Sequence, residues 1–341
     1  MVDETRSRVT ATVSDAGQAG LREVVRVADA GLHPWVHAEV PQTERFAALH
    51  EELKWALTTA VTDIEFARQF AAAQPSSGQP ARAYLNLWIK VTSDLSVLAG
   101  PRYRGRDPQR PFVTVDAASR LITADDVADL RCVLAEAFAA FAPGYVRVWT
   151  CNRPGDWPGT GHDMRNVAGR IGDLRQNTVP PGLTARSPES LHCYDRYAQI
   201  HREHVAVQPE HAVRARLETR DDLVELLAAG MVFDVVLHGQ WVGPIAAEPS
   251  VQHGLRGAIV VELLLDPAVR GQGYGRHLST LLAQQLHAPD DWFLLGTIHL
   301  DNTASYKSAI AAGRRDVGGE VIVMLPARNE CNERLEDETG Q

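Results

Sequence analysis

The most informative part of the sequence is Val261-Glu-Leu-Leu-Leu-Asp-Pro-Ala-Val-Arg-Gly-Gln-Gly-Tyr-Gly275, an apolar run followed by a glycine-rich turn. The run belongs to a strand predicted over residues 257–265, and a helix is predicted over residues 276–286. The three glycines permit positive φ and close approach of the backbone to a bound group, so successive N–H groups can converge on an anion. The start of the helix and the guanidinium of Arg270 add positive charge. The stretch therefore predicts a cradle for a pyrophosphate.

The spacing of the turn differs from that of other phosphate-binding loops. A P-loop needs the order Gly-Lys-Ser/Thr, which is absent here. A dinucleotide-binding fingerprint needs Gly-x-Gly-x-x-Gly in the first strand–helix unit, and Gly271-Gln-Gly-Tyr-Gly275 does not fit it. A tight strand-to-helix turn that binds nothing stays open as the alternative.

Arg270, Gly273 and Gly275 match the motif Arg/Gln-x-x-Gly-x-Gly/Ala, and on these residues the sequence resembles the GNAT superfamily of N-acyltransferases. The resemblance covers residues 183–325 and includes the order of the elements. It implies an α/β (α+β) fold with a mixed, largely antiparallel sheet flanked by helices, and acetyl-CoA or another acyl-CoA as cofactor. It also implies that strand 257–265 splays from its neighbour, so that the backbone there pairs with the pantetheine arm.

A second part of the resemblance lies between Asn302 and Gly313, where Asn302 and Ser305 match the family's asparagine and small residue. Many family members carry a tyrosine seven residues after the asparagine as general acid, but this sequence has Ala309 there. The resemblance thus implies a set of cofactor-binding residues on the strand end, the turn and this second segment. They are Leu263, Leu264, Leu265, Arg270, Gly271, Gln272, Gly273, Tyr274, Gly275, Arg276, Asn302 and Ser305.

Three side chains are candidates for proton transfer. Glu262 is the first choice as general base, because a carboxylate in an apolar strand tends to have a raised pKa; pairing with a basic side chain or with solvent is the alternative. His299, near the end of the strand predicted at 292–300, is the second candidate base, although a lone strand histidine is more often a packing residue. Tyr306 is the nearest substitute for the missing tyrosine, with aromatic packing as its alternative.

Composition excludes several classes of partner. The net charge of −9 and the pI near 5.8 argue against nucleic acid. The sequence has neither a stretch long and apolar enough to span a bilayer nor a signal peptide, so we expect a cytoplasmic protein. The four cysteines lie far apart without a CxxC pair, which favours reduced thiols, and no histidine pattern predicts a metal. No feature indicates an oligomeric state.

The chain of 341 residues is longer than the usual single domain. Val179-Pro-Pro-Gly182 disfavours a continuous helix or central strand, so the predicted domains are 1–178 and 179–327, with a polar acidic tail at 328–341. The element order of the first domain loosely repeats that of the second, which makes a degenerate copy of the same fold a hypothesis. Residues 117–123 contain no glycine, so no cofactor is expected there; this half would instead cover the acceptor cleft or complete a shared sheet.

The remaining predicted elements follow from hydrophobic periodicity. Helices are predicted at 44–73, 124–141, 189–205, 220–227 and 303–312, and strands at 83–91, 112–116, 145–150, 231–238, 241–247 and 319–325.

The function predicted from these residues is direct transfer of an acyl group, most simply acetyl, from coenzyme A to a primary amine of a small molecule or amino acid. An amide near Leu263 would hold the oxyanion. Two alternatives stay open: a non-catalytic acyl-CoA-binding module, and decarboxylation or hydrolysis of an acyl thioester on the same fold.

Overall fold

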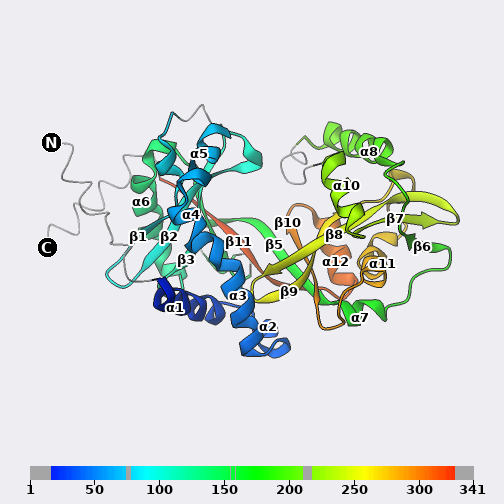
Figure 1. The fold of residues 1–341 in the computed structure, drawn as a ribbon, viewed down its shortest axis with the longest axis horizontal. Coiled ribbons are helices and arrows are strands. Elements are labelled where there is room, and N and C mark those ends of the chain that lie inside the picture. Colours follow the sequence, from blue (N-terminus) through cyan, green and yellow to red (C-terminus); the bar gives the residue numbers. More distant parts are fainter. Residues whose placement is uncertain (1–16, 74–77, 154, 158, 210–216, 327–341) are drawn as a thin grey trace. The chain divides into compact units, whose positions relative to one another are not determined.

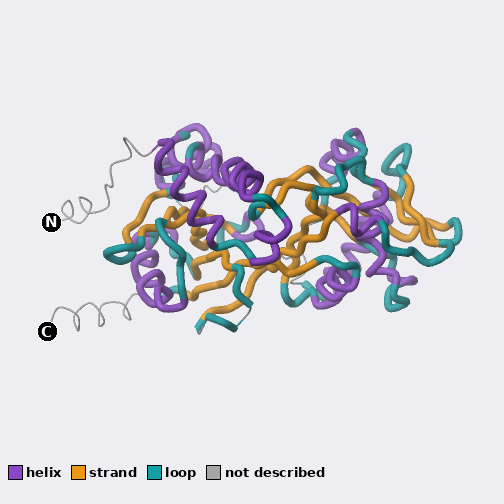
Figure 2. Tube along the Cα trace, turned by 90° about the horizontal axis from the view of Figure 1, so that it is seen from below, coloured by secondary structure: helices purple, strands orange, loops and turns teal. Residues whose placement is uncertain are grey.

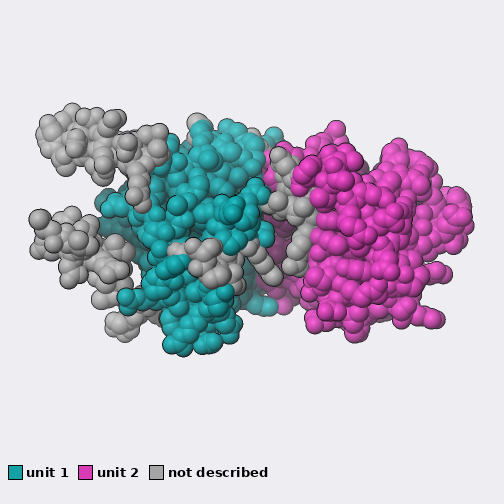
Figure 3. All heavy atoms as spheres, turned by 90° about the horizontal axis from the view of Figure 1, so that it is seen from above, with its two compact units in different colours: residues 1–163, 318–341 teal, residues 164–317 magenta. Residues whose placement is uncertain are grey.

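The computed structural model describes residues 17–73, 78–153, 155–157, 159–209 and 217–326. Within these residues the chain has a mixed α/β fold whose strands pair mostly antiparallel, with helices beside them (Figures 1 and 2). This confirms the predicted fold class. The chain divides into two compact units, residues 1–163 with 318–341 as unit 1 and residues 164–317 as unit 2 (Figure 3).

Unit 1 begins with helices and continues with strands. Its elements are α1 Gly17–Ala30, α2 Pro34–Glu39, α3 Gln42–Leu57, α4 Thr59–Thr62, α5 Ile64–Ala73, η3 Ala81–Tyr84, β1 Leu87–Lys90, β2 Ser96–Tyr103, η4 Arg104–Arg106, β3 Pro111–Ala118, η5 Ala124–Asp126, α6 Val127–Ala137, η6 Ala139–Phe141 and β4 Tyr145–Thr150. The end of the last strand, β11 Arg315–Met324, also belongs to this unit. The strand order is β1-β2-β3-β4-β11, and only β3 and β4 are parallel neighbours.

Two apolar layers hold unit 1 together. Val127, Leu130 and Leu134 of α6 pack on one face of the sheet, in a buried cluster with Val113 and Val146. The opposite face is covered by α1, α3 and α4, through a cluster around Val24, Leu98 and Ala117. Each helix buries one apolar stripe, as a three-layer arrangement requires.

Unit 2 alternates strands and helices. Its elements are β5 Thr160–Arg170, which begins in unit 1, α7 Ile171–Arg175, β6 Leu183–Arg186, α8 Tyr194–Val207, α10 Arg220–Ala228, β7 Val232–Leu237, β8 Gln240–Gln252, β9 Leu255–Leu263, η7 Pro267–Val269, η8 Tyr274–His277, α11 Leu278–Gln285, β10 Phe293–His299 and α12 Thr303–Ala311. The strand order is β5-β10-β9-β8-β7-β6. Helix α11 covers one face of this sheet through Leu278, Leu281 and Leu282. The other face is covered by α8 and α10, through Tyr197 and Leu223.

The unit bounds differ from the predicted domains 1–178 and 179–327 because of two strands. Residues 164–170 of β5 precede the predicted boundary, yet they pair with β10 in unit 2, from Met164↔His299 to Arg170↔Phe293. Strand β11 is the last described strand of the chain. Its end nevertheless pairs with β4 in unit 1, from Gly319↔Thr150 to Met324↔Tyr145. Each unit therefore contains a strand from the other half of the sequence. The predicted tail at 328–341 lies outside the described residues.

Several predicted elements need correction. The helix predicted at 44–73 is divided into α3, α4 and α5. The last of these begins after Asp63, whose carboxylate accepts hydrogen bonds from the N–H groups of Glu65 (2.8 Å) and Phe66 (3.1 Å). The structure adds helices α1, α2 and α7 and strands β2, β5 and β6, which the periodicity did not predict.

The cysteines and the hydropathy of the helices bear on two further predictions. Cys132 is disulfide-bonded, so the expectation of four reduced thiols is wrong for this residue: distance along the sequence does not measure distance in the fold. Cys151 and Cys193 are thiols, as predicted for them. No helix in the described ranges has both the length and the apolarity needed to cross a membrane.

Candidate functional site

The candidate site lies in unit 2, where the parallel strands β9 and β10 separate. Their backbones pair from Gly257↔Phe293 to Ile259↔Leu295 and no further, although β9 continues to Leu263 and β10 to His299. Beyond this point β9 stays paired with β8, and β10 with β5. The edges that face each other thus carry backbone N–H and C=O groups that no neighbouring strand uses, which suits an extended ligand.

A β-bulge lies in β9 at this opening. Ala246 of β8 pairs with Glu262 and Ala247 pairs with Val260, so Val261 is one residue extra on β9. A bulge re-aims the side chains beside it and is common next to active sites. Here it places Glu262 on the face of the sheet that α8 covers, where its carboxylate contacts Tyr197.

The glycine-rich turn follows η7 and leads into α11. Gly271 (φ 76°) and Gly273 (φ 86°) have left-handed backbone conformations that side chains rarely adopt, as predicted. Gly275 does not have a positive φ, which corrects the prediction for this residue. A Cβ there would come within 3.0 Å of the Ser308 hydroxyl on α12, so a larger residue would require that side chain to shift.

The turn presents unpaired donors. Among the described residues, the backbone N–H groups of Gly271, Gln272 and Gly273 donate no hydrogen bond. The helix predicted at 276–286 begins earlier, as the 3₁₀ turn η8 at Tyr274, and Gly273 is its N-cap. Free N–H groups before a helix start attract anions. The exposed side chains of Arg270 and Arg276 flank these donors.

Arg270 is held in place beside the turn. Its Nε donates to the carbonyl of Leu265 at 2.8 Å, and one terminal nitrogen lies 3.3 Å from Nδ1 of His204 on α8. Asp266, at the end of the same strand segment, accepts two hydrogen bonds from Arg196 of α8, at 3.0 and 2.8 Å. These contacts join α8 to the segment between β9 and the turn.

Glu262 has the environment that the sequence predicted. Its Oε2 accepts a hydrogen bond from the hydroxyl of Tyr197 at 2.8 Å, and its side chain is only partly exposed. Burial raises the pKa of Glu262 to about 7, and the hydrogen bonds from Tyr197 and from the N–H of Leu263 offset part of that rise. The Tyr197 hydroxyl also accepts from the N–H of Glu218 at 3.2 Å. A carboxyl with this pKa can take up a proton near neutral pH.

The three leucines predicted to meet the pantetheine arm differ in their hydrogen bonding. The N–H of Leu263 donates to Oε1 of its neighbour Glu262 at 2.9 Å. The N–H of Leu264 donates to the carbonyl of Pro244 in β8, so it is already used. The carbonyl of Leu265 accepts from Arg270, and its side chain is buried in the core. Leu263 is therefore the one of the three whose N–H is bound only by a side chain, which a ligand can displace.

The other two catalytic candidates have local partners. Nδ1 of His299 accepts from the N–H of Asp301 at 3.2 Å. The hydroxyl of Tyr306 donates to Asp316 at 2.9 Å, and Asp316 also binds Arg165 at 2.7 Å. A tyrosine hydroxyl that donates its hydrogen bond to a carboxylate is poorly placed to protonate a leaving group.

Asn302 and Ser305 form the start of α12. The side chain of Asn302 is the N-cap and accepts from the N–H of Ser305 at 3.2 Å. This contact accounts for both residues structurally. Ala309, in place of the family's tyrosine, is buried on the same helix.

A pocket of about 410 Å³ lies on the α10 side of the splayed strand β9. Part of its wall is the apolar edge formed by Ile259, Val260 and Val261, together with Leu226. The rest is acidic: Glu218, Asp222, Glu225 and Glu248. Four carboxylates around one pocket favour a cationic ligand. This acidic pocket was not predicted, because its residues come from separate segments.

Unit 1 has a related arrangement without the glycine-rich turn. Its parallel strands β3 and β4 pair from Val113↔Val146 to Val115↔Val148, with α6 between them in sequence. The pairing of β2 with β3 also contains a bulge, between Leu98 and Ala99. This similarity is what the hypothesis of a degenerate second copy requires.

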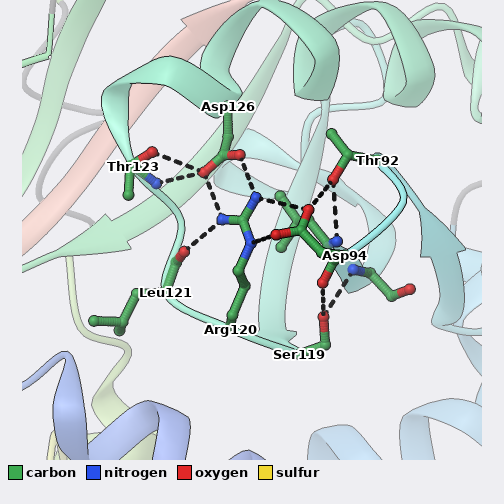
Figure 4. A network of polar contacts seen from close by, with 9 residues as sticks. Thr92, Asp94, Ser119, Arg120, Leu121, Thr123 and Asp126 are labelled. Atoms are coloured by element: carbon green, nitrogen blue, oxygen red, sulfur yellow. Dashed lines mark hydrogen bonds and ion pairs between the residues drawn. The ribbon is translucent and has the colours of Figure 1, made fainter.

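In unit 1 the segment between β3 and α6 is filled by an ion-pair network (Figure 4). Arg120 binds Asp94 at 2.8 Å and Asp126 at 2.7 Å. The hydrogen bond from Arg120 lowers the pKa of Asp94 to about 2. Asp126 also accepts from the N–H of Thr123, in a capping box that uses the donors of the helix start. Carboxylates and used donors oppose phosphate binding there.

Tyr197 is the main residue of the candidate site that sequence reasoning missed. It is almost fully buried on α8, and its hydroxyl connects Glu262 to the backbone of Glu218. In the sequence Tyr197 is one aromatic residue on a predicted helix, and its partner Glu262 lies 65 positions later.

No protein-family model matches the sequence, and no curated protein matches it. Solved structures similar to the chain include a GCN5-related N-acetyltransferase from Kribbella flavida, 16% identical with a TM-score of 0.44, over 78% of this chain and 97% of that one. Another is a GCN5-related N-acetyltransferase from Sphaerobacter thermophilus, 13% identical with a TM-score of 0.41, over 80% and 95%. A third is a GNAT-family acetyltransferase from Colwellia psychrerythraea, 8% identical with a TM-score of 0.44, over 67% and 86%. With identities and TM-scores this low, these similarities do not determine the function of the chain.

Proposed function

We propose that unit 2 is an acyl-CoA-dependent N-acyltransferase that transfers an acyl group, most simply acetyl, directly to a primary amine. The observation that carries this proposal is the combination of two features on consecutive elements. Strands β9 and β10 stop pairing after Ile259↔Leu295, and the turn that follows β9 has three backbone N–H groups without a partner among the described residues. One feature suits an extended thioester arm, and the other suits a pyrophosphate.

The residues present fit coenzyme A. The N–H groups of Gly271, Gln272 and Gly273, with the guanidinium groups of Arg270 and Arg276, would hold the phosphates. The unpaired edges of β9 and β10 would hold the pantetheine arm. Bound acyl-CoA supplies an activated carbonyl group.

The chain's own contribution to the reaction is proton uptake and charge stabilisation. Glu262 takes the proton of the attacking amine, since its pKa of about 7 leaves a large part ionised at neutral pH. This requires its carboxylate to release the N–H of Leu263, 2.9 Å away, which then donates to the developing oxyanion. A single movement of Glu262 would thus provide both base and oxyanion donor.

The acidic pocket supports an amine as acceptor. Its four carboxylates attract a cation, and its apolar wall is the same part of β9 that adjoins Glu262. We therefore assign the acceptor to cationic small molecules, and we propose that unit 1 is a degenerate copy that binds no cofactor.

A non-catalytic acyl-CoA-binding module is the second candidate. It is favoured by Ala309 in place of a tyrosine acid and by the engagement of Tyr306 with Asp316. A solvent-delivered proton suffices for a thiolate, so these residues do not exclude transfer.

Release of free coenzyme A from acetyl-CoA separates the candidates. The full chain is assayed with a set of primary amines and without any amine. Amine-dependent release, with acetylated amine as product, supports the acyltransferase. Release without amine indicates hydrolysis or decarboxylation, and binding without release indicates the binding module.

A further inference from the structure

Each arginine beside the glycine-rich turn donates a hydrogen bond to a histidine ring. One terminal nitrogen of Arg270 lies 3.3 Å from Nδ1 of His204 on α8, and Nε of Arg276 lies 3.2 Å from Nε2 of its neighbour His277. A guanidinium group has donors and no acceptor, so the ring nitrogen that faces it has to be the unprotonated one. Both rings are therefore neutral in this arrangement.

The second nitrogen of each ring has a partner that fits the same tautomer. Nε2 of His204 lies 3.3 Å from Oε1 of Gln208, one turn further along α8, and can donate to it. The ring of His277 is hydrogen-bonded to the backbone of Thr178. Burial and the charge of Arg276 lower the pKa of His277, and the hydrogen bond to Thr178 offsets part of that fall. In both rings a further proton would therefore add at the nitrogen that faces the arginine.

The charged groups around His204 and Arg270 balance one another. The carboxylates of Asp266 and Glu203 pair with Arg196, at 2.8 and 3.7 Å, and both also attract Arg270. These are two carboxylates and two guanidinium groups, so a bound pyrophosphate would give the region an excess of negative charge. Negative charge beside a histidine favours the protonated ring.

We propose that His204 and His277 are part of the phosphate site and take up protons there when the ligand binds. As Arg270 and Arg276 turn toward the phosphates, the ring nitrogens that faced them become acceptors for protons from the solvent. Histidine changes charge between pH 5 and 8, so this uptake takes place near neutral pH. The inference rests on the proposed function, and it adds two residues that the sequence prediction of the cofactor site did not include.

Calorimetry of acetyl-CoA binding, in buffers of different ionisation enthalpy, counts the protons taken up for each ligand bound. The double variant His204→Gln, His277→Gln removes both rings. The double variant His192→Gln, His287→Gln is the matched control, since His192 precedes α8 and His287 follows α11. Protons taken up by the ligand's own phosphate groups, or by other groups of the protein, are common to the wild-type protein and both double variants.

At pH 7 we expect the wild-type protein and the control to take up at least about half a proton more per acetyl-CoA than the His204→Gln, His277→Gln variant. The ratio of wild-type affinity to the affinity of this variant should rise about tenfold from pH 8 to pH 6. The reason is that protonated rings bind the phosphates better, and each unit by which binding raises a pKa strengthens binding tenfold.

Equal proton uptake in the wild-type protein and a folded His204→Gln, His277→Gln variant would overturn the inference, and so would an affinity ratio that does not change with pH. Imidazole proton signals of the wild-type protein give a measurement that needs no folded double variant. Near pH 7, acetyl-CoA should move the signals of His204 and His277 toward those of protonated rings, and signals that stay in place during binding would contradict the inference. A wild-type protein that binds no acetyl-CoA would overturn the proposed function itself.

Discussion

Glu262 is the side chain on which the proposed chemistry depends most. Glu262→Gln keeps the size of the side chain but has one acceptor oxygen in place of two, so it can retain the hydrogen bond from Tyr197 or that from Leu263, and it cannot act as a base. General base catalysis contributes about 10²- to 10⁴-fold, so we expect kcat to fall at least about 10²-fold while acetyl-CoA affinity stays the same. Steady-state kinetics and calorimetry measure both. An unchanged kcat would show that Glu262 is not the base.

The pH dependence of the wild-type enzyme follows from the same carboxyl. The ionised form is the active base, so kcat should rise with pH through the pKa of about 7 and then level off. Glu262→Gln should lose this rise, apart from any slope that the acceptor amine itself gives to both proteins. The same rise in both proteins would assign the titration to another group.

Tyr197 is expected to act as a positioning residue that tunes Glu262. Its hydrogen bond stabilises the carboxylate and lowers the pKa of Glu262, against the effect of burial. Tyr197→Phe should therefore move the rising limb of the pH profile upward by about one unit, with little change on the plateau. A limb that stays in place, in a variant with unaltered thermal stability, would show that the hydroxyl does not reach the base during turnover.

The sequence could predict that single residues such as Glu262 are unusual, but it could not predict their contact partners. A glutamate in an apolar strand is visible as an exception in a pattern, and so is Ala309 at a position where the family has a tyrosine. The hydrogen bond from Tyr197 to Glu262 joins residues 65 positions apart, and the one from Tyr306 to Asp316 joins α12 to the following strand, so no local pattern encodes either contact.

The turn between η7 and α11 is the element that would hold the phosphates. Gly273 has a φ of 86° and open space around its Cβ position, so Gly273→Ala adds backbone strain of about 1 kcal/mol without a clash. The strain should shift the N–H groups and weaken acetyl-CoA binding at least tenfold. Gly239→Ala is the control, because Gly239 has a similar φ of 83° and similar open space but lies in the β7–β8 hairpin. Calorimetry should show normal affinity there; equal losses in both variants would contradict the assignment.

The elements with strong local signals were predicted best. The strand and turn over 257–275, the hairpin of β7 and β8, and α12 all follow from periodicity and glycine positions. β2 and β5 were missed because a proline in one and polar residues in the other interrupt the apolar alternation. The long helix predicted at 44–73 was wrong, since a new helix begins after Asp63 although the apolar stripe continues.

The strand pairing predicts that the two halves of the sequence do not fold separately. A fragment of residues 1–178 lacks β11, the partner of β4, and a fragment of residues 179–341 lacks β5, the partner of β10. Each fragment alone should show poor dispersion in proton–nitrogen spectra and rapid proteolysis, whereas co-expression should give a protected complex. Two well-folded, protease-resistant fragments would contradict this expectation.

This arrangement also explains why the predicted boundary near Val179-Pro-Pro-Gly182 differs from the observed units. Prolines mark a place where regular structure is interrupted, but they do not show which sheet a strand joins. Length and composition were enough to predict two domains. The pairing of β5 with β10 and of β11 with β4 depends on contacts across about 130 or more residues.

Hydrogen exchange of the full chain, with and without acetyl-CoA, tests whether unit 2 holds the acyl-CoA site. We expect slower exchange on binding at residues 260–263 of β9 and at residues 271–275 of the turn, with no change at residues 116–126 of unit 1. Unchanged exchange in β9 and the turn, or protection at residues 116–126 instead, would contradict the assignment of the acyl-CoA site to unit 2.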